Sequence, residues 1–141
     1  MSQHAWPAHL PVGAFRFARP SADLEACTRF YRDAVGLSVL AEFRGHAGYD
    51  GAVFGLPDSS AHLELTRQAG DGRVPEPSPE NQLVLYLPDA DAVAGVVARL
   101  AAFGHAPVEP ANGYWSDRGA VAFEDPDRWV VVFAPWIFGA Q

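Results

Sequence analysis

The chain has 141 residues, of which 49% are hydrophobic and 12% aromatic, a composition that favours one packed domain over a disordered chain. Ten basic and 17 acidic side chains give a net charge of −7, which repels phosphate backbones and offers no basic patch to a membrane surface. We therefore expect neither nucleic acid nor a membrane as a partner.

No apolar run approaches the roughly 20 residues of a membrane-spanning helix. Residues 1–10 also lack the basic start and apolar core of a secretion signal. We therefore expect a cytoplasmic protein. The single cysteine, Cys27, excludes an internal disulfide, and its position on an apolar helical stripe favours a small buried side chain over a nucleophile.

The first half of the chain has the pattern of a β-α-β-β-β unit. Residues 1–12 are expected to form a lead-in to a strand at 13–19, and Ser21 is the expected N-cap of a helix that stops at Gly36. Strand patterns follow at 37–44, 49–56 and 61–67, with turns at 45–48 and 57–60. Together these elements predict a first module over residues 13–68.

The outline of the first module returns in the second half of the chain. Three residue pairs lie 68 positions apart: Pro20 and Pro88, Asp23 and Asp91, and Gly36 and Gly104. After a glycine- and proline-rich linker at 69–80, the second module (81–135) is expected to contain a strand at 82–87, a helix at 91–103, strands at 106–109, 119–123 and 129–134, and turns at 110–113 and 125–127, before a tail at 136–141. Because each module is too small to bury its own core well, the two should pack together as one domain.

Several short motifs accompany this repeat. They are Phe30-Tyr31-Arg32-Asp33 followed by Gly36-Leu37, then His62-Leu63-Glu64, and Glu124-Asp125-Pro126-Asp127 before the last strand. In this order the chain resembles the vicinal oxygen chelate superfamily, which includes glyoxalase I, bleomycin-resistance proteins and extradiol dioxygenases. The resemblance covers residues 13–135. It implies an α+β fold in which two βαβββ modules form a curved mixed sheet around a cleft.

The resemblance also implies a homodimer, because in this superfamily two clefts are commonly completed across a two-fold axis. Exposed apolar sheet edges of the half-length modules favour the same assembly.

In the superfamily's enzymes the cleft floor holds a divalent metal, with ligands from the first and last strands of each module. Such a metal needs histidine or carboxylate donors. Of the four corresponding positions only Glu64 offers one; the others fall on Ala14, Phe15 or Arg16, on Gln82 or its neighbours, and on Val132. We therefore expect no metal cofactor, with Glu64 as a ligand if a divalent metal does bind.

Strand alternation predicts which side chains face the cleft. If the helix covers Phe15 and Phe17, the residues on the opposite strand faces are Arg16, His62, Glu64, Gln82 and Tyr86. We expect Arg16 to pair with Glu64 in place of a metal, since a guanidinium matches a carboxylate bidentately; the alternative is that Arg16 reaches solvent.

Each of the other polar and aromatic candidates has two possible roles. His46, Tyr49 and Asp50, at a hairpin end, either line the cleft mouth or shape the turn, and Tyr114 and Trp115 either wall a ligand pocket or fill the core. His62 is either a general base or polar cover. Turn formation at Pro126 suffices to explain Glu124, Asp125 and Asp127.

These observations predict a protein that binds a small organic molecule in a metal-free, aromatic-lined cleft. An acidic protein with tyrosine and tryptophan faces suits a cationic or amphipathic ligand. The alternative is a metal-dependent glyoxalase-like lyase or dioxygenase that uses Glu64 with His62 or His46. A purely structural interaction module is disfavoured, because an inward polar cluster is costly without a purpose.

Overall fold

The computed structural model describes residues 7–56, 60–70 and 73–139. The first module contains β1 (Phe15–Pro20), α1 (Leu24–Arg29), a π-helical turn η1 (Phe30–Val35), β2 (Val39–His46), β3 (Tyr49–Gly55) and β4 (Ala61–Gln68). The second contains β5 (Gln82–Tyr86), α2 (Ala90–Ala102), α3 (Gly113–Asp117), β6 (Val121–Glu124) and β7 (Val130–Ala134). The predicted two-module α+β fold is confirmed. Most of the turn predicted at 57–60 lies outside the described residues.

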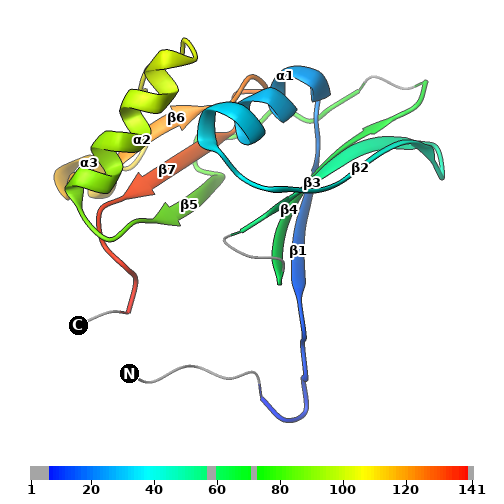
Figure 1. Cartoon of the computed structure of the whole chain (residues 1–141), viewed down its shortest axis with the longest axis horizontal. Helices are drawn as coiled ribbons and strands as arrows, with labels where there is room; N and C mark the ends of the chain where they lie inside the picture. The colour runs from blue at the N-terminus through cyan, green and yellow to red at the C-terminus, as the bar shows by residue number, and fades with distance from the viewer. Residues whose placement is uncertain (1–6, 57–59, 71–72, 140–141) are drawn as a thin grey trace.

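Each module forms its own mixed sheet (Figure 1). The strand order is β1-β4-β3-β2 in the first sheet and β5-β7-β6 in the second, and the first strand of each module runs parallel to the last. As a result β1 and β5 are edge strands. Within the described part of the chain, no helix is long and apolar enough to span a membrane.

Two predicted elements of the second module differ from the structure. The strand expected at 106–109 is reduced to a single bridge between Val108 and Ala122, because Pro107 and Pro110 flank it and cannot donate to a sheet ladder. The stretch from Asn112 to Trp115, expected as a loop, leads into the short helix α3, whose N-terminus is capped by the Asn112 side chain.

The first helix starts later than predicted. Asp23 is its N-cap and accepts a hydrogen bond from the backbone N–H of Ala26 at 3.1 Å. The prediction of Ser21 as the cap was wrong, because its hydroxyl donates instead to Asp127 at 2.6 Å. The helix widens into η1 and ends at Gly36, which has the predicted left-handed conformation with a φ of 91°.

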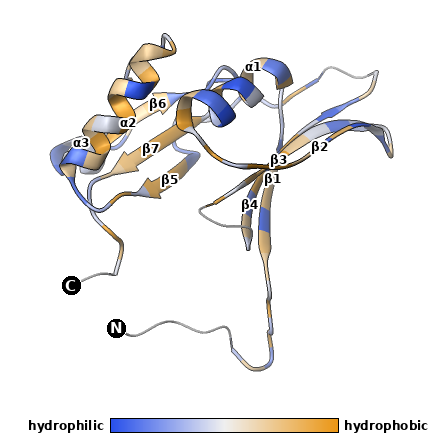
Figure 2. Ribbon diagram, viewed as in Figure 1, coloured by the Kyte–Doolittle hydropathy of each residue, from blue (hydrophilic) through white to orange (hydrophobic). Residues whose placement is uncertain are grey.

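The core lies where the helices meet the two sheets. Figure 2 shows hydrophobic residues along β5 and β7 and hydrophilic ones on the outer side of α1. Arg99 of α2 donates to the carbonyl groups of Asp33 and Ala34 at the end of η1, at 2.8 to 3.2 Å, so the two helices are joined. One buried cluster draws residues from both modules: Cys27, Phe30, Tyr31, Leu63, Leu65, Val93, Leu100, Phe123, Val131 and Phe133.

Phe15 and Phe17 lie on the core-facing side of β1 but are not covered. Their register partners on β4 are Ala61 and Leu63, yet their exposed fractions are 57% and 60%. The expectation that the helix covers them was wrong, because α1 follows the far end of β1 and lies over that end of the sheet only (Figure 1). The two rings line an apolar groove of about 350 Å³ between the sheets, with Leu63, Leu83 and Trp129 among its other walls.

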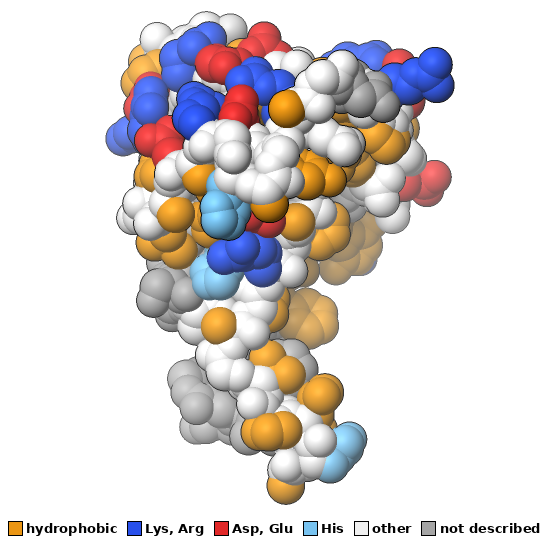
Figure 3. Space-filling model, turned by 90° about the vertical axis from the view of Figure 1, so that its right-hand side faces the viewer, with side chains coloured by type: hydrophobic (Ala, Val, Ile, Leu, Met, Phe, Trp, Pro, Cys, Tyr) orange, Lys and Arg blue, Asp and Glu red, His pale blue; other side chains and the backbone are white. Residues whose placement is uncertain are grey.

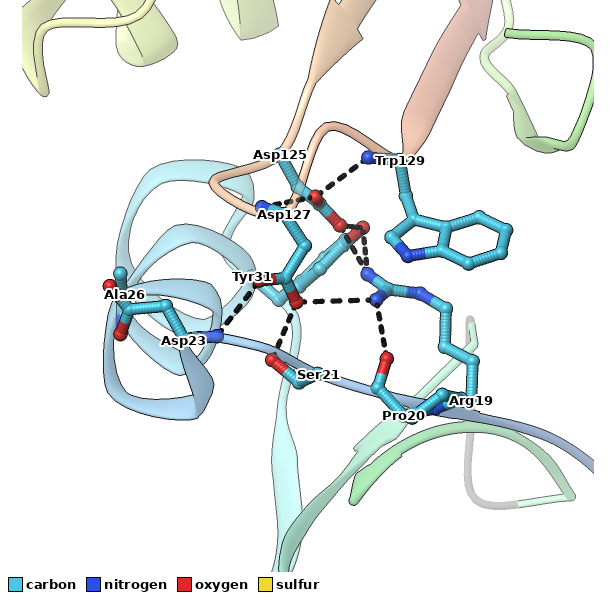
Figure 4. A network of polar contacts seen from close by, with 9 residues as sticks. All are labelled: Arg19, Pro20, Ser21, Asp23, Ala26, Tyr31, Asp125, Asp127 and Trp129. Carbon is cyan, nitrogen blue, oxygen red and sulfur yellow. Dashed lines mark hydrogen bonds and ion pairs between the residues drawn. The ribbon is translucent and has the colours of Figure 1, made fainter. Parts of the chain in front are cut away.

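A buried ionic network joins the two modules beside this groove, whose lining includes Arg19 and Tyr31 (Figure 4). Arg19, only 6% exposed, pairs with Asp125, lies 3.6 Å from a carboxylate oxygen of Asp127 and donates to the Tyr31 hydroxyl at 3.2 Å. The Tyr31 hydroxyl in turn donates to Asp125 at 2.6 Å. Because Asp125 and Asp127 belong to the β6–β7 turn, this network ties the end of β1 to the opposite module.

The protonation states in the network follow from burial and hydrogen bonding. Burial is the main cause that raises the pKa of both Tyr31 and Cys27, so Tyr31 remains a phenol that can donate, and Cys27 is an unactivated thiol. Burial opposes ionisation of Asp127 too, but hydrogen bonds from Ser21, Cys27 and the Asp23 N–H hold the pKa of Asp127 below its usual value. Asp127 is therefore an anion that helps to neutralise Arg19.

We expect Arg19→Met to lower the free energy of unfolding by about 3–5 kcal/mol, because both buried carboxylates lose their cation. Tyr31→Phe, which removes one hydroxyl donor to Asp125, should cost about 1–3 kcal/mol. Urea unfolding measures both values. The control is Arg32→Met, which removes only a surface pair with Asp33 and should change stability little; a loss from R19M no larger than that from R32M would contradict the role of the network.

Candidate functional site

The outer face of the first sheet carries a polar cluster. The β1–β4 register places Arg16 beside His62 and Ala18 beside Glu64, which confirms the predicted strand alternation. Arg16 Nη1 lies 3.4 Å from Glu64 Oε2, and Arg16 Nε donates to His62 Nδ1 at 3.3 Å. The predicted pair is present, but the Arg16 side chain is 46% exposed and that of Glu64 16%. We call Arg16, His62 and Glu64 the polar half-site.

The outer face of the second sheet carries aromatic rings. Trp115 of α3 packs against a buried cluster of small side chains on β6 and β7, and its indole Nε1 donates to Gln82 Oε1 at 3.1 Å. The rings of Trp115 and Trp136 are nearly parallel, with centroids 6.0 Å apart. Trp115 therefore fills the space above the strands. We call the rings that gather here the aromatic half-site: Tyr86, Tyr114, Trp115, Trp136 and Phe138.

The two half-sites face away from each other within one chain. Leu65 of the first sheet and Phe133 of the second point into the same helical core, so the opposite faces of both sheets point outward. Figure 3 looks onto the outer side of the first sheet and shows a basic side chain between histidine side chains in the middle of that face. The cleft that we expected between the two modules is therefore not closed by this chain alone.

The residues at the superfamily's metal positions do not fit a metal. Glu64 is paired with Arg16, and the amide oxygen of Gln82 accepts the Trp115 indole N–H. Val132 has no donor and is fully buried. Elsewhere in the described residues, donor atoms of Cys27, Asp125 and Asp127 lie within 4.8 Å of one another, but the guanidinium of Arg19 already supplies the positive charge there.

The hairpin residues shape their turn. His46 pairs with Tyr49 across the β2–β3 turn, and Asp50 accepts hydrogen bonds from the Gly45 N–H at 2.9 Å and from Arg67 at 3.0 Å. Asp50 is the register partner of Arg67, on the core side of the sheet, whereas Arg16 is on the outer side. Of the two readings, the geometry of Asp50 favours turn formation; the Tyr49 ring, 40% exposed, is on the outer face at the hairpin end.

The sequence did not reveal the roles of two groups of residues, Trp136 and the pair Asp125 and Asp127. Trp136 lies in the segment that we expected to be a tail, and its only signal was an aromatic residue directly after a buried strand. Asp125 and Asp127 were explained by a turn alone. The signal that could have revealed their partner was Arg19, a charged residue at the last core-facing position of an apolar strand.

The chain has two βαβββ-like modules, and each module begins with an edge strand. This arrangement defines the vicinal oxygen chelate fold of the glyoxalase, bleomycin-resistance and dioxygenase superfamily. Within it the chain belongs to the YycE-like family. Residues 15–66 match the YycE-like N-terminal domain and residues 80–135 the YycE-like C-terminal domain.

Individual relatives agree with this assignment. The uncharacterized protein YycE of Bacillus subtilis (strain 168) is 43% identical over 118 residues, 84% of each chain. A crystal structure of a YycE protein from Bacillus subtilis superposes with a TM-score of 0.85 at 38% identity, over 94% of this chain and 98% of the other. TnmS3, an antibiotic binding protein from Streptomyces sp. CB03234, has a TM-score of 0.61 at 27% identity, over 86% and 94%.

Arg16 and Glu64 should show a measurable but modest coupling in a double-mutant cycle with Arg16→Met and Glu64→Gln. We expect a coupling energy of up to about 1 kcal/mol, because water reaches the arginine. Urea unfolding of the four proteins measures it. A control cycle of Arg16→Met with Glu25→Gln, whose carboxylate binds Arg67 instead, should be additive; equal additivity in both cycles would show that the Arg16–Glu64 contact has no energetic weight.

Proposed function

We propose that this protein binds a small organic molecule, without a metal, between an aromatic and a polar half-site. The aromatic half-site carries this proposal: five rings from β5, α3 and the segment after β7 gather on one sheet face. Ligand pockets are commonly apolar and aromatic with a few placed polar groups. Arg16, His62 and Glu64 supply such groups.

The ring faces suit a planar ligand that carries positive charge. Tyrosine and tryptophan faces attract cations through their quadrupoles, and the net charge of −7 favours cations in the surrounding field. The likeness to TnmS3, an antibiotic binding protein at 27% identity, supports a binding role for this chain. The rival role is a lyase or dioxygenase with a metal at Glu64. The structure gives this role no support, because Glu64 is paired with Arg16 and the Gln82 amide oxygen accepts the Trp115 N–H.

A second copy of the chain is proposed to complete each cleft. The half-sites of one chain point apart, so an aromatic face can meet a polar face only across a contact between two chains. The free edges of β1 and β5 and the exposed rings of Phe15 and Phe17 provide the contact surface. A two-fold contact that uses both edges closes after two chains and forms two equivalent clefts.

Thioflavin T, a planar organic cation, should bind saturably and quench the fluorescence of Trp115 and Trp136, whereas the anionic dye 1-anilinonaphthalene-8-sulfonate should bind more weakly. Tyr86→Ala should weaken thioflavin T binding by about threefold to tenfold, since an aromatic contact contributes about 0.5–1.5 kcal/mol. Fluorescence titration measures the affinity.

The matched control for this titration is Phe103→Ala, which removes an exposed ring at the end of α2 and should leave the affinity unchanged. EDTA should also leave it unchanged, and elemental analysis should find no stoichiometric Zn, Ni, Mn or Fe. Equal binding by Y86A and the unmodified protein would contradict the site. Binding that disappears with EDTA would restore the metal-dependent alternative.

Light scattering after gel filtration should give twice the chain mass of 15.2 kDa. Replacement of both Phe15 and Phe17 by serine should shift the protein towards monomer with an unchanged far-ultraviolet spectrum, because both rings are more than half exposed in the single chain. The control is Phe103→Ser, which replaces a residue that is 52% exposed in the single chain. This variant should stay dimeric. A monomer mass for the unmodified protein across a concentration series would refute the shared cleft.

A further inference from the structure

The segment before β1 stands away from the body of the molecule. This segment, residues 7–14, runs on from β1 past the end of the first sheet and then bends back in a turn at residues 7–10 (Figure 1), because β4 begins opposite Phe15. All of them except Val12 are exposed. Their backbone hydrogen bonds are local, from Leu10 to Pro7 and from Val12 to Leu10 at 2.8 Å each. We call residues 7–14 the arm.

The arm has the composition of a segment that packs on a surface. It contains Pro7, Leu10, Pro11 and Val12 but no Asp, Glu, Lys or Arg, and Leu10 is 48% exposed. Its two prolines restrict the backbone, so docking orders less chain than it would in a flexible segment. Proline-rich extended segments characteristically dock on aromatic surfaces.

A matching surface lies at the end of the second sheet. Tyr86 ends β5 and is the register partner of Ala134, the last residue of β7. Beyond that point the rings of Trp136 and Phe138 lie 6.1 and 6.0 Å from the Tyr86 ring. Phe138 is 77% exposed and Ile137 46%. We call Tyr86, Trp136, Ile137 and Phe138 the aromatic end.

We infer that the arm of one copy packs on the aromatic end of a second copy. The inference rests on the proposed dimer, in which the free edge of β1 lies beside the free edge of the partner copy's β5. If the two edges run antiparallel, the segment before β1 extends past the end of β5, where the aromatic end lies. A parallel pairing would instead place the arm beside Asn81 and Gln82, whose amides do not match its apolar side chains.

A second copy fits better than the arm's own chain. The arm leaves from the first sheet, whereas the C-terminal segment leaves from the second, and the groove lined by Phe15 and Phe17 separates these two sheets (Figure 1). An exchange of arms also satisfies two-fold symmetry, since each copy offers one arm and one aromatic end. The arm then borders the aromatic half-site of the partner copy, so it contributes a wall to the proposed ligand cleft.

Crosslinking of mixed single variants tests this contact. The L10C and F138C variants are prepared separately, mixed to allow subunit exchange and treated with a short bis-maleimide. Cys27 does not compete, because it is fully buried and burial raises the pKa of its thiol. Peptide mass spectrometry should find a link between positions 10 and 138, which is necessarily between chains since each variant carries one new thiol. F103C, at a ring position that is also more than half exposed, replaces F138C in the control mixture.

A second measurement uses the dimer equilibrium. Leu10→Ser should raise the dimer dissociation constant by about tenfold, as expected for partial burial of one leucine, and His9→Ser, a polar change in the same arm, should not. The arm contact alone is overturned in either of two cases while the dimer still forms. In the first, the 10–138 link is no more abundant than the 10–103 link of the control mixture. In the second, L10S does not weaken the dimer. A monomeric protein overturns the contact together with the dimer, while the dye titration still reports separately on ligand binding.

Discussion

The arrangement of the two modules depends on one buried guanidinium. Arg19, the penultimate residue of the edge strand β1, points into the core and pairs with carboxylates that come from the other module. A buried charge without its partner is costly, so the two modules can separate only if these groups become solvated again. The Trp129 ring, 5.0 Å from the guanidinium carbon, closes one side of the network against water. The Arg99 contacts with the end of η1 fix the helices in the same relative position.

This arrangement decides which faces of the two sheets point outward. Because the helices of both modules share one core, each sheet turns its helix-free face outward, and the polar and aromatic half-sites lie on opposite sides of the chain. The groove between the sheets is left with uncovered phenylalanine rings. The proposed association with another copy would both cover this groove and bring the two kinds of half-site together. The sequence alone could suggest this only through family resemblance, since strand alternation says which residues share a face but not which faces meet.

The parts of the structure that follow from local chemistry were predicted well. Alternation placed Arg16 with His62 and Glu64, and the left-handed glycine ended the first helix where expected. Predictions failed where a distant residue competed for a local role. Ser21 is a good N-cap by composition, but the anionic Asp127, 106 positions away, takes its hydroxyl, and Asp23 caps the helix instead. Trp115 could not be assigned either, because the buried cluster that it packs against comes together only when β6 and β7 pair.

The positions that carry metal ligands in the superfamily's enzymes are satisfied here by contacts that need no ion. Glu64 has Arg16, the Gln82 amide has the Trp115 indole, and Val132 is packed beneath the aromatic side chains. The Trp115 contact also orients a ring over the sheet, so the interaction that occupies a metal position helps to build the aromatic face. A histidine introduced at position 82 would therefore not simply add a ligand, because it would also remove the amide oxygen that accepts the Trp115 indole N–H. The contact that occupies position 82 and the aromatic face of the second sheet thus have a common physical origin.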